Sequence, residues 1–156
     1  MERKDRSRRT IATNRRARRD YEIVSTTEAG LVLVGTEVKS LRDGKADLKD
    51  AYAVPRDGEL FLVGMHIGPY DRGGHFNHEP RRERKLLLHR REIRRLSTRV
   101  RERGFTLIPL DLYFSGARVK VLLGLARGRR QYDNREAIRE REDRREARAD
   151  ADRRKR

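Results

Sequence analysis

The residues best suited to chemistry in this chain are the cations and the aromatic residue between Lys120 and Arg135. This segment, KVLLGLARGRRQYDNR, begins as an alternating apolar stretch that must end in a core and continues as arginines that cannot enter one. Tyr132 follows Arg129 and Arg130 and lies outside any apolar pattern. Basic residues beside an aromatic are typical of RNA binding, in which each stacked base contributes roughly 1 to 3 kcal/mol. We therefore predict that Tyr132 stacks on a base, in preference to the alternative that it is an exposed tyrosine with no binding role.

The charge of the whole chain favours a polyanionic partner. Lys and Arg number 41 against 25 Asp and Glu, which gives a net charge of +16 and a pI near 11.1. Each phosphate that Lys or Arg neutralises releases counterions, so such a chain gains free energy on nucleic acid. The alternative is a solvated surface that only repels itself. We favour polyanion binding because an excess this large needs a partner to offset its repulsion.

The histidines do not form a convincing metal site. His75 and His78 lie three residues apart and could be joined by His66 and His89. The chain has no cysteine to support them, and the loop between them has no ligand-like pattern. We expect loop-surface histidines that contact RNA, with no metal and no cofactor. For Phe76, in the same loop, packing and stacking remain equally open.

No sequence motif for catalysis is present. Gly73-Gly74 is not followed by the Lys-Ser or Lys-Thr pair of a phosphate-cradling loop, and there is no Gly-x-Ser-x-Gly segment. An RNA-processing nuclease would need a carboxylate cluster for metal, whereas the acids here are scattered among arginines. The chain is therefore predicted not to be an enzyme.

Residues 20–126 carry the pattern of one folded RNA-binding body. Strands are expected at 21–24 and 31–35 around a turn at Glu28-Ala29-Gly30, and hairpins at 46–54 with 59–65 and at 105–114 with 117–125. A short helix is expected over 36–44, capped by Thr36, and a second one around Ile93, Leu96 and Val100, ended by Gly104.

Residues 66–84 have neither the helical nor the strand periodicity of apolar residues, and they form a loop long enough to suspect function. Antiparallel strands with one amphipathic helix indicate a mainly β fold, a small closed or nearly closed barrel with Arg118 and Lys120 on its wet face.

Two basic flanks extend this body. Residues 1–19 hold nine Lys or Arg against two acids, so we expect an arm that is mobile until it meets phosphate. Residues 127–156 hold 13 Lys or Arg and eight acids, with Ile138 as the lone large apolar side chain. A helix that is polar on every side is not stable alone, so this tail is predicted to be disordered when free and helical on a phosphate-lined surface. No apolar run approaches the roughly 20 residues that span a bilayer, which indicates a soluble, cytoplasmic protein.

Five separated motifs resemble a known family. They are Asn14-Arg15-Arg16-Ala17 before Asp20-Tyr21, Glu28-Ala29-Gly30, EVKSLRDGK at 37–45, RKLLLHRREI at 84–93 and GLARGRRQYDNR at 124–135. In order and spacing they resemble the small protein B family, the SsrA-binding proteins, from about Ile11 to about Arg145.

The resemblance implies a six-stranded antiparallel barrel related to the oligonucleotide-binding (OB) fold, with short flanking helices and a C-terminal tail that orders on the ribosome. It implies a monomeric protein that binds transfer-messenger RNA (tmRNA, or SsrA RNA). With elongation factor Tu and GTP, the protein would bring the alanine-charged tRNA-like domain to the A site of a stalled ribosome. The ribosome, not this protein, would then transfer the peptide, and the nascent chain would be tagged for proteolysis.

The resemblance also implies the contact residues. Positions that would contact the tRNA-like domain are Asn14, Arg15, Arg16, Glu28, Leu87 and Lys120. By itself the sequence agrees for Lys120, does not distinguish a turn former from an RNA contact at Glu28, and favours a core position for Leu87. The positions that would engage the decoding centre and the empty mRNA channel are Arg127, Arg129, Arg130, Tyr132, Asp133 and Arg135.

This chain departs from the family's usual pattern in the tail. Arg127, Arg129 and Arg130 stand where the family usually has lysine, which keeps the charge. Asn134 stands where a lysine is usual and removes one charge. The alternative function is a general basic RNA chaperone or ribosomal protein, which would discriminate weakly between tmRNA and bulk RNA.

Overall fold

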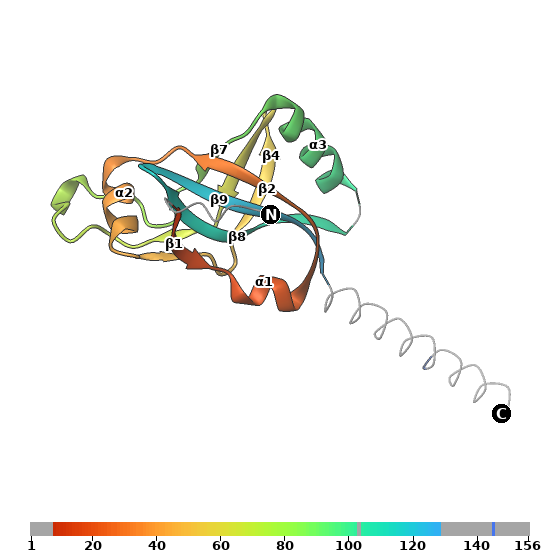
Figure 1. Cartoon of the computed structure of the whole chain (residues 1–156), viewed down its shortest axis with the longest axis horizontal. Helices are drawn as coiled ribbons and strands as arrows, with labels where there is room; N and C mark the ends of the chain where they lie inside the picture. Colours follow the sequence, from red (N-terminus) through yellow and green to blue (C-terminus); the bar gives the residue numbers. More distant parts are fainter. Residues whose placement is uncertain (1–7, 103, 129–144, 146–156) are drawn as a thin grey trace, which may run out of the picture.

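The computed structural model of the protein describes residues 8–102, 104–128 and 145 (Figure 1). In chain order the elements are β1 (Arg8–Thr13), α1 (Arg15–Asp20), β2 (Tyr21–Leu31), α2 (Gly35–Arg42), β3 (Ala46–Asp47), β4 (Tyr52–Arg56), β5 (Glu59–Val63), β6 (His66–Ile67), the 3-10 helix η1 (Gly74–Phe76), β7 (Arg84–Leu87), α3 (Arg90–Arg101), β8 (Phe105–Ser115) and β9 (Arg118–Gly128). Among these described elements, no helix is long and apolar enough to cross a membrane.

Six strands close into an antiparallel ring. They pair in the order β8-β4-β5-β7-β2-β9, and β9 pairs back onto β8, which leaves no open edge within the ring. Strand β1 adds to the outside of β8, while β3 and β6 form a separate two-stranded sheet. The predicted mainly β, six-stranded barrel with short helices is confirmed.

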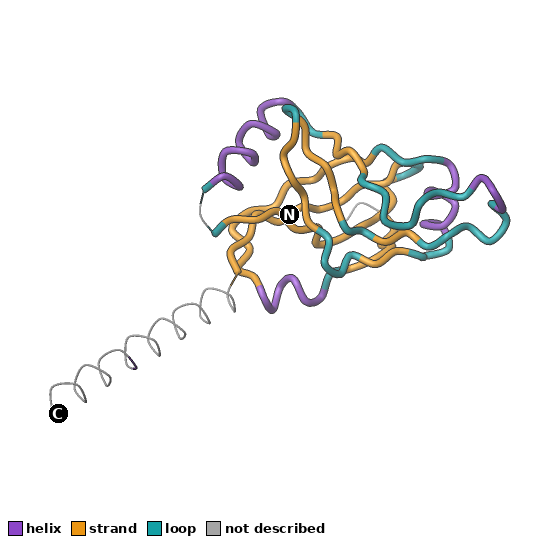
Figure 2. Tube along the Cα trace, turned by 180° about the vertical axis from the view of Figure 1, so that it is seen from behind, coloured by secondary structure: helices purple, strands orange, loops and turns teal. Residues whose placement is uncertain are grey.

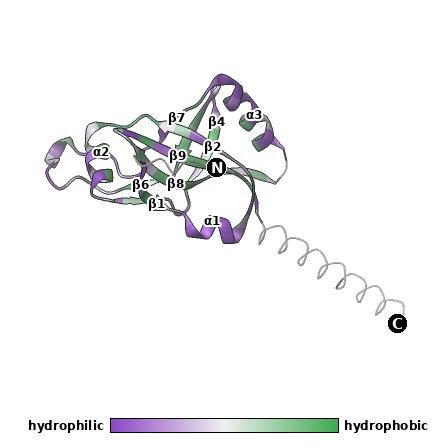
Figure 3. Cartoon of the chain, in the orientation of Figure 1, coloured by the Kyte–Doolittle hydropathy of each residue, from purple (hydrophilic) through white to green (hydrophobic). Residues whose placement is uncertain are grey.

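The barrel interior is filled by one side of each strand. On β9, Val119, Val121 and Leu123 are buried, whereas Arg118 is exposed and Lys120 is half-buried. This is the predicted alternation, and it appears as alternating hydrophobic and hydrophilic colour along the strands (Figure 3). Since directly paired residues share a face, the ladder fixes which side chains reach the outer surface of the barrel.

Helix α3 closes one end of the barrel, at the opposite end from α2 (Figure 2). Its face at spacings of three and four buries Ile93 and Leu96, and Val100 packs against the same core. Gly104 follows with φ of +85°, a conformation that favours glycine at a helix end. The predicted helix and its terminator are therefore confirmed.

The expectation that residues 8–19 have no structure of their own is wrong. Strand β1 joins the sheet through backbone pairing with β8, which needs no apolar side chain. Helix α1 covers a small second core outside the barrel, where Ala17 packs against Ile108, Leu110 and Ala126. Composition missed both elements because every other side chain of α1 is polar and the one buried residue is a small alanine.

Boundaries of four elements also differ from expectation: β2, α2, β4 and β9. Strand β2 runs unbroken through Glu28-Ala29-Gly30, so there is no turn there, and it ends at Leu31. Gly30 suits the strand because an added Cβ would lie 3.2 Å from Leu87 Cβ. Helix α2 begins one residue early, and Thr36 Oγ1 bonds His78 instead of capping it. The two predicted hairpins are present, although β4 begins only at Tyr52 and β9 continues to Gly128.

Candidate nucleic-acid interface

Four strands bring one row of residues together on the outside of the barrel. Tyr113 of β8 pairs with Lys120 of β9, Lys120 pairs with Gly30 of β2, and Gly30 pairs with Leu87 of β7. Paired residues point to the same face, and Glu28 shares that face because it lies two residues before Gly30. We call Glu28, Gly30, Leu87, Tyr113 and Lys120 the Lys120 face.

Leu87 lies on this face rather than in the core. Its side chain is 51% exposed, whereas its neighbour Leu86 is fully buried. The core position that the sequence favours for Leu87 is therefore wrong. In a run of three leucines the apolar character does not show which ones face outward, and only the pairing of β7 with β2 decides it.

Glu28 is held in place by its neighbour on the face. Tyr113 Oη donates a hydrogen bond to Glu28 Oε2, and the guanidinium of Arg8 lies 3.7 Å from the centre of the Tyr113 ring. Burial, and then the hydrogen bond and charge of Glu28, raise the pKa of Tyr113 well above its ordinary value, so the phenol stays a donor at neutral pH. Among the described residues Oε1 of Glu28 has no partner, which leaves it able to accept a hydrogen bond from a ligand.

Arg8, Arg18 and Tyr113 adjoin the face or belong to it, and the sequence did not single them out. Arg8 of β1 and Arg18 of α1 each place a guanidinium nitrogen 3.9 Å from Asp111 Oδ2. Counting the register from the turn at Gly116 would have found Tyr113, because that register sets it opposite Lys120. No local signal could have found Arg8, since its position depends on the pairing of β1 with a strand about a hundred residues later.

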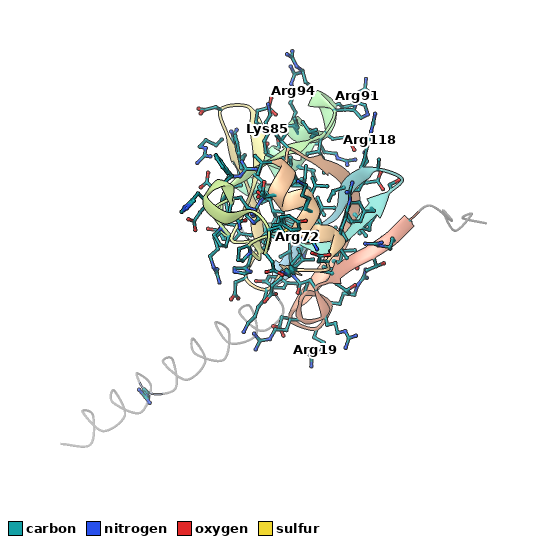
Figure 4. The ribbon with its side chains drawn as sticks, turned by 90° about the vertical axis from the view of Figure 1, so that its left-hand side faces the viewer. Arg19, Arg72, Lys85, Arg91, Arg94 and Arg118 are labelled. Carbon is teal, nitrogen blue, oxygen red and sulfur yellow. The ribbon has the colours of Figure 1, made fainter. Side chains whose placement is uncertain are left out.

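The motif at the start of α1 divides into a cap and two exposed cations. Asn14 is 9% exposed; its Oδ1 accepts from the Ala17 N–H at 3.2 Å and its Nδ2 donates to Pro109 O at 3.0 Å. The side chain therefore fixes α1 on the barrel. Arg15 and Arg16 are exposed, and Arg16 lines a groove of about 340 Å³ together with Tyr52. Arg19 of α1 and Arg91 and Arg94 of α3 point away from the barrel (Figure 4).

Only one of the predicted tail residues lies within the described residues. Arg127 belongs to β9, opposite Glu22 and Phe105, and its guanidinium lies 4.8 Å from the centre of the Phe105 ring. It is therefore a residue of the barrel wall as well as the first cation of the basic segment. The others, Arg129, Arg130, Tyr132, Asp133, Asn134 and Arg135, lie outside the described residues, as does the predicted disorder of the tail.

His78 has a structural position. It is 9% exposed, with Nδ1 2.9 Å from Thr36 Oγ1 and Nε2 2.9 Å from Ile67 O. The expectation that it contacts RNA at a loop surface is wrong, because both ring nitrogens are used inside the protein. Over residues 8–102, 104–128 and 145, no group of three or more His, Cys, Asp or Glu is placed to hold a metal ion.

The ring of strands and its outer face, with a lysine, a carboxylate bonded to Tyr113 and an exposed leucine, define a closed, mainly antiparallel β-barrel with a polar and basic outer face. The chain belongs to the SmpB family, whose model, described as SmpB protein, matches residues 11–153. The SsrA-binding protein of Staphylococcus saprophyticus is 57% identical over 131 residues, which cover 84% of this chain and 85% of that protein. The SsrA-binding protein of Staphylococcus aureus strain Newman is 55% identical over the same length and coverage.

A solved structure agrees with these relatives. It is described as "tmRNA-SmpB: a journey to the center of the bacterial ribosome", and its chain is 53% identical, with a TM-score of 0.66, over 82% of this chain and 94% of that one. The resemblance found in the five motifs is thereby confirmed at the level of the family.

Proposed function

We propose that this protein binds the tRNA-like domain of tmRNA through the Lys120 face and acts in trans-translation on stalled ribosomes. Relatives named SsrA-binding protein and a structural neighbour from a tmRNA-SmpB ribosome study support the proposal. The observation that carries it is the meeting of Glu28, Leu87 and Lys120, which match family contact positions, on one exposed face from three separate strands.

The chemistry of the face suits a folded RNA. Lys120 supplies a cation for a phosphate, and Leu87 offers an apolar surface to a sugar or base. Oε1 of Glu28 accepts from a base amino group or a 2′-hydroxyl, which explains an acid on a phosphate-binding surface. Recognition of this kind reads shape and 2′-hydroxyls rather than a linear sequence.

In the same proposal, the basic segment after Gly128 enters the decoding centre and the empty mRNA channel, through Arg129, Arg130, Tyr132, Asp133 and Arg135, with Arg127 at its root. Delivery would occur in a complex with elongation factor Tu, GTP and alanyl-tmRNA, in the cytoplasm where ribosomes work. We further propose that the protein makes and breaks no bonds itself, so that peptide transfer belongs to the ribosome.

Replacing Lys120 by Glu is expected to weaken binding to the tRNA-like domain roughly tenfold or more. The change removes a phosphate contact and places a negative charge beside Glu28. Filter binding over a range of salt should show a shallower dependence of log affinity on log salt, by about one ion. Arg101→Glu is the matched control, because it makes the same charge reversal on the last residue of α3, at the far end of the barrel. If both variants lost affinity equally, the loss would be explained by net charge alone, and this would contradict a specific role for the Lys120 face.

Tyr113→Phe tests whether Glu28 acts through a fixed geometry. The ring and its stack with Arg8 stay, while the hydrogen bond to Oε2 is lost. A hydrogen bond to a charged group is worth about 1.5 to 3 kcal/mol, so we expect a loss of RNA affinity of roughly tenfold with an unchanged salt dependence. Thr98→Val, which removes the hydroxyl of an exposed threonine on α3 and its hydrogen bond to Arg94 O, should leave affinity unchanged. If Tyr113→Phe binds like the parent, Glu28 does not depend on its tyrosine.

A further inference from the structure

The loop between β6 and β7 is held in a defined shape. Asn77 Oδ1 accepts from the Tyr70 N–H at 3.0 Å, and Asn77 Nδ2 donates to Tyr70 O at 2.7 Å. The N–H of Gly73 donates to Tyr70 O at 2.9 Å, and that of Phe76 donates to Gly73 O at 3.0 Å. An added Cβ at Gly73 would lie 2.9 Å from Asn77 Nδ2, so glycine lets the Asn77 side chain approach the backbone here. Hydrogen bonds on both sides of Phe76 therefore fix its position.

This defined loop displays Phe76 to solvent. The side chain is 90% exposed, which rules out the packing role that the sequence left open. A single exposed apolar residue is common on protein surfaces and needs no explanation. Here a second one lies beside Phe76, because Val34 is 44% exposed and lines the same groove. Figure 4 looks onto this end of the molecule, where Arg72 of the same loop is labelled.

A groove of about 470 Å³ separates Phe76 from the start of α2. Lys39 and Arg82 line it together with Phe76 and Val34, and none of the described residues that line it carries a carboxylate. The charge of Arg82 is paired with Glu37 Oε1 at 2.5 Å, so Lys39 is the lining cation that a phosphate would meet. Lys39 also lies 5.5 Å from the centre of the Tyr70 ring, which holds its charge beside the loop. An aromatic face next to cations is the arrangement by which proteins bind unpaired bases.

We propose that this groove holds one unpaired nucleobase of an RNA, stacked on Phe76, with the adjoining phosphate at Lys39. The net charge of +16 favours a polyanion over a protein ligand, and the groove presents Lys39 beside an apolar wall rather than a purely apolar surface. The proposal rests on the proposed RNA-binding function but concerns a site separate from the Lys120 face. The base could belong to tmRNA or to ribosomal RNA, which present the same chemistry.

Phe76→Ala tests the groove, with Phe76→Trp as the variant that restores stacking. We measure affinity for the isolated tRNA-like domain of tmRNA and for vacant ribosomes, each as a function of salt. Phe76→Ala should lose roughly tenfold in one of these two arms, and that arm identifies the source of the base. The salt dependence should not change, because no phosphate contact is removed, and Phe76→Trp should bind like the parent.

Two controls keep a failure of this proposal distinct from a failure of the proposed function. Val24→Ala truncates another exposed apolar residue, 43% exposed, and should bind like the parent. Lys120→Glu is run in the same series. Unchanged affinity of Phe76→Ala in both arms, beside a weakened Lys120→Glu, overturns the groove alone, whereas unchanged affinity of both variants overturns RNA binding by this barrel. Affinity for free ribosomal RNA is measured beside the ribosome arm: a loss on ribosomes with unchanged affinity for both RNAs would assign the groove to a ribosomal protein and overturn the proposal.

Discussion

Truncation after Gly128 is expected to abolish tagging of nascent chains on stalled ribosomes and to leave affinity for the tRNA-like domain of tmRNA nearly unchanged. Gly128 is the last residue of β9 and pairs with Tyr21, so the cut preserves every pairing of the barrel. The removed residues 129–156 include 12 Lys or Arg, which under the proposed function bind the decoding centre and the mRNA channel. Tagging is measured in a translation reaction on a message without a stop codon, and affinity by filter binding.

A composition control separates charge from sequence in the removed segment. A variant with residues 129–156 in scrambled order keeps the same charge, so it should restore any non-specific part of RNA affinity without restoring tagging. Loss of both activities on truncation would mean that the barrel and the segment do not act at separate places.

Glu37→Ala is expected to lower the free energy of unfolding by about 3 to 5 kcal/mol. Glu37 and Arg84 are both fully buried and bonded to each other through Oε2 and Nε. Arg84 of β7 also donates to Met65 O at 2.7 Å and to Pro80 O at 3.1 Å, so one guanidinium ties α2 to the connection between β5 and β6 and to the loop before β7. Removing the carboxylate leaves this buried charge without its counterion. Chemical denaturation measures the loss.

The paired replacement Glu37→Leu with Arg84→Met is the control for Glu37→Ala. It should be more stable than either single variant, because no buried charge is left alone. Burial alone would raise the pKa of Glu37, but hydrogen bonds from Arg82, the Val34 N–H and Arg84 hold that pKa below its ordinary value of 4.5. The contribution of Glu37 is therefore present above pH 4.5 and is lost as the pH falls through the lowered pKa. A Glu37→Ala variant as stable as the parent at neutral pH would contradict the account.

Much of the barrel follows from local pattern. The hairpin strands alternate, Asp57-Gly58 and Gly116 take positive φ at the turns, and α3 shows its apolar stripe, so periodicity alone predicts them. Strand β1 and helix α1 could not be found this way, because they depend on a partner strand far along the chain and on one small alanine. Burial of a Glu–Arg pair 47 residues apart leaves no local signal either.

The candidate site was predictable by a different route. Lys120 could be placed on the outer face from alternation, but the outward position of Leu87 needed the ladder between β7 and β2. The partner of Glu28 needed the register of the last hairpin, and the bond that anchors Asn14 Nδ2 to the barrel needed the position of Pro109 on β8. The family resemblance identified Asn14, Glu28, Leu87 and Lys120 without a physical reason. The fold supplies one for the last three, because it brings them together on one face.

The central claim is that the Lys120 face selects a folded, tRNA-like RNA rather than offering charge to any RNA. A competition experiment at about 0.15 M salt tests it most directly, with labelled tRNA-like domain of tmRNA challenged by an unlabelled random transcript of equal length. We predict that the random transcript competes far more weakly than the unlabelled tRNA-like domain does. Equal competition by the two RNAs would contradict the claim and favour a general basic RNA chaperone.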